Sequence, residues 1–250
     1  MIDAAAPRVV YEEIDSTNAE AARRAAAGDC GPVWIRTTAQ TAGRGRRGRS
    51  WTSAPGNLHL TYLGVFSQPP AQLALLSFAA ALAVADCADQ ALGRPVALVK
   101  WPNDVLIMGR KLSGILLESG SAKAGGSWLA IGVGVNVAAT PGHVDQPAVA
   151  LRDLEPAKPV TADGVEATLR RRLAFWSGVL ERDGFEPLRA AWMPRAHGLG
   201  GQAVARLGAE EITGVARGLT ADGALELELA DKTRRFISAG EVIFGASKAA

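Results

Sequence analysis

The sequence predicts an α+β fold in which a mixed β-sheet with flanking helices is followed by a small SH3-like β-barrel. Two observations predict it. Up to residue 197, short apolar and β-branched runs alternate with longer helical patterns, as in a mixed sheet covered by helices. From Gly198 onward, short alternating runs separated by glycines replace them, which is typical of a small barrel. We therefore expect a large domain over 1–197 and a barrel over 198–250.

The first predicted helix begins near Asn18, because Thr17 and Glu20 have the spacing of a capping box, and it ends at Gly28. The other elements expected in the large domain are strands over 33–38, 58–66, 97–101, 105–108, 112–118 and 128–137, and helices over 70–92, 160–182 and 187–193. The barrel strands are expected over 203–207, 212–219, 224–229, 235–237 and 241–244.

Composition excludes several classes of protein. Lys and Arg number 27 against 25 Asp and Glu, a net charge of +2, which argues against a wholly basic nucleic-acid binder and against an acidic disordered chain. Two cysteines do not make a disulfide framework, and the N-terminus lacks the apolar run of a signal peptide. Polar residues break the uncharged stretch 50–85 before it reaches the roughly 18 apolar residues of a membrane span. We expect a cytoplasmic protein with no membrane partner.

Four arginines gather in a glycine-rich loop, Gly43-Arg-Gly-Arg-Arg-Gly-Arg-Ser-Trp51. Glycines let the backbone approach a ligand, and arginines supply forked donors that suit phosphate or carboxylate. The loop lacks the Gly-Lys-Ser/Thr of a nucleotide-binding P-loop. It also lacks the helix that should follow a dinucleotide fingerprint, since Pro55 and Gly56 stand there. A solvated basic loop or a nucleic-acid tether remains an alternative for this segment taken alone.

Three further motifs carry polar or small residues at strand ends. Lys100-Trp-Pro-Asn-Asp104 places a lysine, an amide and a carboxylate at a turn, which suits Mg²⁺ and phosphate, although an ordinary Asn-Asp turn would also explain it. Lys111-Leu-Ser-Gly114 places a lysine at the start of an apolar strand that a ligand could approach closely, the alternative being a surface lysine and a sheet kink. Gly132-Val-Gly-Val-Asn136 opens one face of a strand, for a ligand or for packing.

In combination and in this order, these motifs closely resemble the biotin–protein ligases. Ser16-Thr17-Asn18 and Gln40 complete the pattern, and the resemblance covers about residues 1–245. It implies a catalytic domain like that of the class II synthetases, followed by the barrel. It also implies an enzyme that uses Mg²⁺ with ATP to convert biotin to biotinyl-5′-AMP. The biotinyl group would then pass to a lysine of the biotin carboxyl carrier domain of a biotin-dependent carboxylase.

The resemblance also implies roles for individual residues. The catalytic residues would be Lys111, Arg46 and Arg49. The biotin-binding residues would be Ser16, Thr17, Asn18, Gln40, Gly43, Arg44, Gly45, Arg46, Lys111, Gly114 and Gly132. The ATP-binding residues would be Arg46, Arg49, Trp51, Lys100, Asn103, Asp104, Lys111 and Asn136, with Asp104 as a candidate Mg²⁺ ligand.

One departure from the family pattern concerns DNA. Regulatory members carry a winged-helix domain before the Ser-Thr-Asn segment, which starts here at residue 16, so we expect a monofunctional ligase that binds no specific DNA. We expect a monomer or a weak homodimer promoted by ligand. Two alternatives remain: a lipoate-attaching or acyl-transferring relative, and a nucleic-acid-binding module. A lipoate-attaching or acyl-transferring enzyme would not be expected to combine the arginine loop with the Lys-Trp-Pro-Asn-Asp motif. A nucleic-acid-binding module would need aromatic residues on which bases stack, and the aromatic content of 6% weighs against it.

Overall fold

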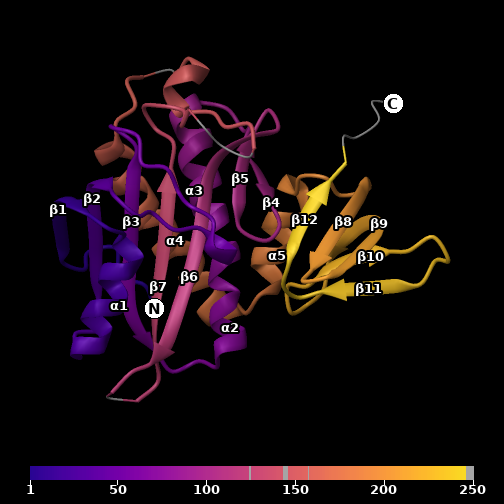
Figure 1. Ribbon diagram of the computed structural model, residues 1–250, viewed down its shortest axis with the longest axis horizontal. Helices are drawn as coiled ribbons and strands as arrows, with labels where there is room; N and C mark the ends of the chain where they lie inside the picture. Colours follow the sequence, from indigo (N-terminus) through magenta and orange to yellow (C-terminus); the bar gives the residue numbers. More distant parts are fainter. Residues whose placement is uncertain (124, 143–145, 157, 246–250) are drawn as a thin grey trace.

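The structure, a computed structural model, describes residues 1–123, 125–142, 146–156 and 158–245 and contains two β-sheets (Figure 1). A seven-stranded sheet fills the larger part of the molecule, and a five-stranded antiparallel sheet forms the C-terminal part. This confirms the predicted fold class of a mixed sheet with flanking helices followed by a small β-domain. The last five residues of the expected barrel domain, 246–250, lie outside the described residues.

The large sheet has the strand order β1-β2-β3-β7-β6-β5-β4. Its strands are β1 (Arg8–Ile14), β2 (Val33–Gln40), β3 (Leu58–Phe66), β4 (Leu98–Lys100), β5 (Asp104–Ile107), β6 (Arg110–Ser121) and β7 (Ser127–Val135). Only β1 and β2 pair in parallel among the described strands, so the sheet is mixed. Strand β1 was not predicted from the sequence, because an edge strand with several exposed charged residues lacks an apolar alternation.

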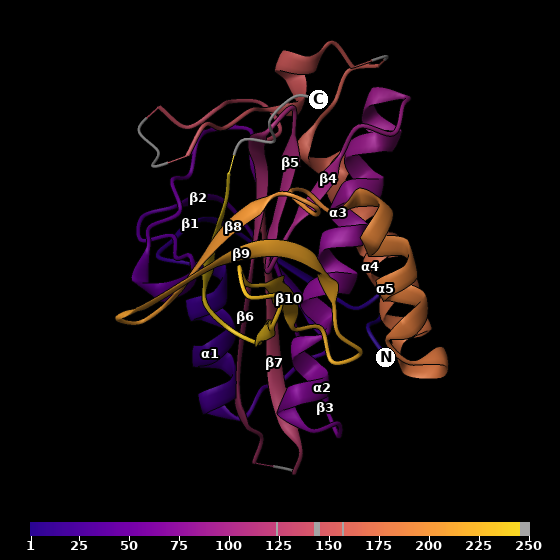
Figure 2. The ribbon, with the colours of Figure 1, turned by 90° about the vertical axis from the view of Figure 1, so that its right-hand side faces the viewer.

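The two faces of this sheet carry different helices. On β2, Val33 and Ile35 pack with Ala21 and Ala25 of helix α1 (Thr17–Ala27), whereas Trp34 belongs to the main hydrophobic core. Because side chains alternate along a strand, α1 covers one face and the main core lies on the other. That core contains α3 (Leu76–Leu92), which packs beside α4 (Ala162–Asp183) (Figures 1 and 2).

Helix α1 begins one residue earlier than predicted. Its N-cap is Ser16, whose hydroxyl accepts a hydrogen bond from the Ala19 N–H, so the expected capping box between Thr17 and Glu20 does not form. The Glu20 carboxylate instead accepts a hydrogen bond from the Tyr11 hydroxyl. The hydroxyl of Thr17 is thereby left available for the polar network described below. The predicted end at Gly28 is confirmed, because this glycine adopts the left-handed conformation of a C-cap.

The long helix predicted over 70–92 is divided into α2 (Pro70–Ala74) and α3 at Leu75. Residues Pro70–Leu92 together are long and apolar enough to cross a membrane, by length and composition only. However, 67% of the most apolar window is buried inside the structure. The segment is therefore the central helix of the core, which explains its uncharged sequence.

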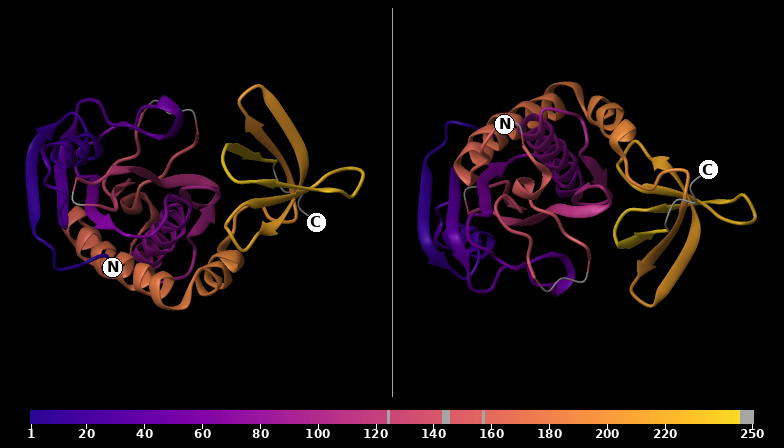
Figure 3. Two further views of the ribbon diagram at one scale, coloured as in Figure 1. Left: turned by 90° about the horizontal axis from the view of Figure 1, so that it is seen from below. Right: turned by 90° about the horizontal axis from the view of Figure 1, so that it is seen from above.

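The C-terminal sheet has the order β11-β10-β9-β8-β12. Its strands are β8 (Gln202–Leu207), β9 (Glu210–Leu219), β10 (Leu225–Glu228), β11 (Arg234–Ile237) and β12 (Glu241–Phe244), close to the predicted ranges. Helix α5 (Glu186–Trp192) leads from α4 towards this sheet (Figure 3). The Trp101 indole N–H donates to the Gly223 carbonyl, and one hydrophobic core continues from the large domain into the small one.

A buried carboxylate fastens α4 to the edge of the large sheet. Glu166 is 2% exposed and accepts hydrogen bonds from Arg8 of β1 and Arg36 of β2, the latter at 2.7 Å. Arg170, one turn further along α4, also pairs with Glu166 at 3.6 Å. A carboxylate this deeply buried is stable as an anion only because these guanidinium groups surround it.

We predict that Glu166→Gln destabilises the protein by about 2–3 kcal/mol, because three guanidinium groups lose their shared anion. Urea unfolding at neutral pH measures the change. The matched control is Glu181→Gln on the same helix, whose side chain is 38% exposed and pairs with the N-terminal amine. If the two variants lose equal stability, the buried cluster has no special role.

Candidate functional site

A cavity of about 180 Å³ opens on the α1 face of the large sheet. Its floor comes from β3, β6 and β7, and its rim comes from the start of α1, the arginine-rich loop and the turn between β4 and β5. The sequence-predicted residues that line it are Ser16, Thr17, Asn18, Gln40, Arg44, Gly45, Arg46, Arg49, Trp51, Asn103, Lys111, Gly114, Gly132 and Asn136. The fold therefore brings together motifs that are spread over residues 16–136 of the chain.

A row of cross-strand partners runs over the sheet under this cavity. Strand pairing places His59 opposite Gly134, Gly134 opposite Gly114, Gly114 opposite Asp104, and Asp104 opposite Lys100. Directly opposed residues share a face of the sheet, so all five point to the cavity side. The row is polar at both ends and has no side chain at Gly134 and Gly114.

The indole of Trp51 lies on these two glycines. A Cβ atom at Gly134 would stand 2.5 Å from indole Cε2, and one at Gly114 would stand 3.0 Å from Cζ3. The Lys111 ammonium lies 5.7 Å from the centre of the Trp51 ring, within the range of a cation–π contact. The expected close approach at Gly114 is thus made by a side chain of the arginine-rich loop.

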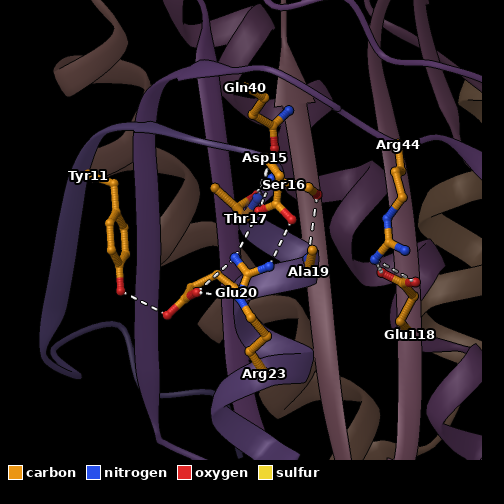
Figure 4. A network of polar contacts seen from close by, with 10 residues as sticks. All are labelled: Tyr11, Asp15, Ser16, Thr17, Ala19, Glu20, Arg23, Gln40, Arg44 and Glu118. Atoms are coloured by element: carbon orange, nitrogen blue, oxygen red, sulfur yellow. Dashed lines mark hydrogen bonds and ion pairs between the residues drawn. The ribbon is translucent and has the colours of Figure 1, made fainter.

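A polar network of Thr17, Asn18, Gln40 and Thr61 occupies the end of the cavity beside α1, and Figure 4 shows Thr17 and Gln40 of this network. The Gln40 Oε1 atom accepts from the Thr17 backbone N–H at 2.9 Å and from its hydroxyl at 3.2 Å, so the Gln40 Nε2 group remains as the donor. The Thr61 hydroxyl lies 2.8 Å from the Thr17 hydroxyl and 2.7 Å from Asn18 Oδ1. Since Thr61 has one proton for two acceptors, one of them can accept from a ligand.

A second glycine position gives this network its room. A Cβ atom at Gly132 would stand 2.2 Å from Asn18 Oδ1, so no other residue fits there without displacing the amide. The Asn18 Nδ2 group donates to Glu118 Oε2 at 2.8 Å and to the Leu116 carbonyl at 3.2 Å. The orientation of the Asn18 amide is therefore set by strand β6.

Each arginine of the loop has its own anchor. Arg44 pairs with Glu118 of β6 at 3.2 Å, and Arg46 donates to the Asn103 side chain at 3.3 Å. Arg49 pairs with Glu241 of β12 at 2.8 Å, and Arg47 donates to the Arg206 carbonyl of β8 at 3.2 Å. The loop thus bridges the large sheet and the C-terminal sheet. Within it, 46–48 form one 3₁₀ turn, where we had expected irregular structure throughout.

The far end of the cavity carries excess positive charge. Burial lowers the pKa of the Arg46 guanidinium, an effect that the nearby Asp104 carboxylate opposes. Burial also lowers the pKa of Lys100, again with Asp104 acting in the opposite direction. The Lys111 ammonium pairs with Asp104 at 2.8 Å. Three cations in reach of one carboxylate favour an anionic ligand at this end.

Comparison with known proteins identifies the family. Residues 11–136 match the Biotin/lipoate A/B protein ligase family, and residues 199–245 match the Biotin protein ligase C terminal domain. A biotin–[acetyl-CoA-carboxylase] ligase of Paracoccus denitrificans is 40% identical over 92% of this chain and 98% of its own length. The chain belongs to the biotin/lipoate A/B protein ligase family. A biotin–[acetyl-CoA-carboxylase] ligase of Mycobacterium tuberculosis is 35% identical over 94% of this chain and 87% of its own.

Solved structures of biotin protein ligases share the fold. The Aquifex aeolicus enzyme in complex with biotin and ATP has a TM-score of 0.80 at 24% identity, covering 96% of this chain and 99% of that one. The bifunctional ligase/repressor BirA of Escherichia coli is 33% identical over 88% of this chain and 68% of its own length. The agreement extends through both sheets of this ligase-family chain.

Three predicted residues of this ligase-family site, Gly43, Lys100 and Asp104, are not among the residues that line the cavity. Gly43 supports the loop, since a Cβ atom there would stand 2.4 Å from the Trp51 carbonyl oxygen. Asp104 and Lys100 lie at the end of the cross-strand row, where Asp104 holds Lys111. Asn136 lines the cavity, but its Nδ2 group also donates to the Lys111 carbonyl and so fixes the start of β6.

Three residues that complete the site, His59, Thr61 and Glu118, were not predicted from the sequence. His59 and Thr61 lie on the cavity face of β3 in a strand that is otherwise apolar, and Glu118 lies on β6, where it accepts a hydrogen bond from Asn18. Their signal was available in the sequence. A polar residue at alternate positions of an uncharged buried strand indicates a lined cavity rather than a core.

Metal ligands are sparse in this ligase-family site. Among the described residues, no three His, Cys, Asp or Glu side chains gather closely enough to hold a metal ion by themselves. Asp104 is a single carboxylate at the cationic end. Mg²⁺ typically takes one or two protein carboxylates and completes its shell with phosphate and water, so the arrangement fits an ion brought in with a nucleotide.

We predict that Glu118→Gln loosens the arginine-rich loop, because Arg44 loses its anionic partner. Trypsin cleaves after arginine, so limited trypsin digestion should cut within 44–49 about two- to fivefold faster than in the parent protein. The control is Glu186→Gln, which removes an exposed ion pair with Arg189 on helix α5, away from the loop. Equal cleavage rates in all three proteins would contradict an anchoring role.

Proposed function

We propose that the chain is an ATP-dependent biotin–protein ligase. It activates biotin to biotinyl-5′-AMP and transfers the biotinyl group to a lysine of a biotin carboxyl carrier domain. The observation that carries this is one cavity with an uncharged polar network at one end and a cationic cluster at the other. The Trp51 indole lies between them on a slot of two glycines. Such a cavity fits an elongated ligand with a neutral head and an anionic tail.

The polar network is complementary to the cyclic urea of biotin. A urea presents one carbonyl acceptor and two N–H donors. Gln40 offers Nε2 as a donor, because its oxygen is already engaged by Thr17. Thr17 and Asn18 offer acceptors, only one of which Thr61 can satisfy at a time. We therefore assign the biotin-binding role to this end of the cavity.

The cationic end supports the first step. A carboxylate oxygen of biotin attacks the α-phosphorus of ATP, an O–P bond forms, and pyrophosphate leaves with the electrons of the broken P–O bond. Two anions must meet, so the main barrier is charge repulsion. Lys111 and Arg46 supply positive charge beside this position, and Arg49 and Lys100 stand close behind. Asp104 would help hold Mg²⁺, which would neutralise further phosphate charge.

The second step requires protection of the intermediate. The neutral amine of the acceptor lysine attacks the acyl carbon, an amide forms, AMP leaves, and the amine gives up its proton to solvent. Water competes with the amine for the same carbon. The arginine-rich loop covers the cavity and is held to β6 by Arg44 and to β12 by Arg49. A closed loop of this kind limits hydrolysis of the adenylate.

Other expectations stay predictions. The division into domains at 197 and 198, the cytoplasmic location, the monomer or weak dimer and the lack of specific DNA binding belong to this group. Operator-type binding that weakens steeply with salt would contradict the last of them.

The direct test is incubation of the protein with biotin, Mg-ATP and a carrier domain. We expect the carrier to gain the mass of one biotinyl group, with a requirement for ATP. A carrier whose acceptor lysine is replaced by arginine is the control and should gain nothing. No mass gain on the intact carrier, with a protein that is folded, would overturn the proposal.

We predict that Lys111→Ala lowers the rate of biotin-dependent pyrophosphate release by about 10²–10³-fold, because the meeting anions lose an adjacent cation. Lys232→Ala, at an 80% exposed lysine, is the control and should leave the rate unchanged. Lys111→Arg retains the charge and the partner for Asp104, so it should recover part of the rate. An unchanged rate in Lys111→Ala would remove this residue from the mechanism.

A further inference from the structure

His59 is a buried polar side chain without a partner. It is 1% exposed, it lines the cavity, and both of its ring nitrogens lack a hydrogen bond within the described residues. The pKa of His59 falls to about 4, because burial and then the Arg36 charge oppose protonation. At neutral pH the ring is therefore uncharged and offers one donor and one acceptor.

A second unpartnered group stands beside it. The indole Nε1 atom of Trp51 is also buried, and among the described residues it has no hydrogen-bond partner. A Cβ atom at Gly134 would stand 2.8 Å from this nitrogen, and Gly134 is the direct cross-strand neighbour of His59. The Trp51 indole nitrogen and the His59 ring therefore lie over neighbouring positions of the cavity floor, and the two side chains cannot satisfy each other if both donate.

The position of His59 along the strand indicates what passes over it. Thr61, two residues further on, belongs to the row that holds the polar network, since it pairs with Gly132. Two residues of a β-strand span about 7 Å. His59 therefore stands one row beyond the network, in the row that leads to Asp104. A ligand that joins the two ends of the cavity crosses this row.

We propose that His59 is a ligand-positioning residue, whose ring N–H and the Trp51 indole N–H bind one oxygen acceptor that arrives with the ligand. This inference rests on the proposed function. The acceptor is either an oxygen of the biotin carboxyl group or a water held under the acyl chain. Buried polar groups are rarely left unsatisfied, and those that are so in a ligand-free protein destabilise it. Ligand binding would then supply the missing hydrogen-bond partner and remove this destabilisation.

The opposing effects on stability and binding provide the test. His59→Phe keeps the ring size and removes both nitrogens. We expect the Tm of the ligand-free protein to rise by about 2–4 °C. We expect the Kd for biotin, measured by calorimetry, to rise by about tenfold, as for one lost hydrogen bond. Tyr62→Phe is the control on the same strand, because its side chain points to the opposite face, and it should leave the Kd unchanged.

Further variants identify the nitrogen and the oxygen. The Gln amide nitrogen can stand where His Nε2 stood, and the Asn nitrogen where Nδ1 stood, so His59→Gln or His59→Asn should restore most of the affinity. The alcohol analogue of biotin, which lacks the carboxylate, distinguishes the acceptors. If His59→Phe no longer weakens binding of the alcohol, the oxygen belongs to the carboxyl group. If the loss persists, the oxygen is a trapped water. Nitrogen NMR of the ring should show a new hydrogen bond on addition of biotin.

Two outcomes would overturn the inference. A lower Tm with an unchanged Kd in His59→Phe would make His59 a core residue, and no change in either quantity would make it inert. Failure of the proposed function is recognised separately, because the parent protein would then neither bind biotin nor release pyrophosphate. A parent that does both, beside a His59→Phe variant of equal affinity, would reject this inference alone.

Discussion

The close contact of the Trp51 indole with the backbone of two neighbouring strands determines how the rest of the site is arranged. It exists because Gly134 and Gly114 are opposite each other and lack side chains. The indole forms a partition, with uncharged hydrogen-bonding groups on one side and cations on the other. It also brings the end of the arginine-rich loop down to the sheet, so the arginines before it can reach their anchors. A methyl group at either glycine would move all of these groups together.

Much of this arrangement followed from local sequence patterns. Gly28 and Gly93 ended their helices as expected, because a left-handed residue after a helix is best served by glycine. The glycine-spaced strands after residue 198 also matched, since alternation and turn residues are local properties. Alternating Gly132 and Gly134 correctly indicated an open strand face, and the cavity there contains most of the residues expected from the motifs.

The features that were not predicted from the sequence depend on contacts between residues that are far apart along the chain. Edge strand β1 has a polar sequence, and the charge of its Arg8 is paired with Glu166, which is 158 residues away along the chain. Thr17 was expected to cap a helix, but its hydroxyl donates to Gln40 and accepts from Thr61, and Ser16 is the N-cap instead. The anchors of Arg47 and Arg49 lie in the C-terminal sheet, and no local pattern could identify them. The sequence therefore indicated that the loop is cationic, but it did not indicate which groups the arginines contact.

One hydrophobic core runs from the large sheet into the C-terminal sheet, and this continuity determines how the protein unfolds. Phe78 lies against Gly223, and the Trp101 indole donates a hydrogen bond to the carbonyl of the same glycine. Each part of the protein would therefore expose buried groups to water if the other part unfolded. The chain should melt as one cooperative unit rather than as two modules. The C-terminal sheet thus covers part of the hydrophobic core in addition to anchoring the arginine-rich loop.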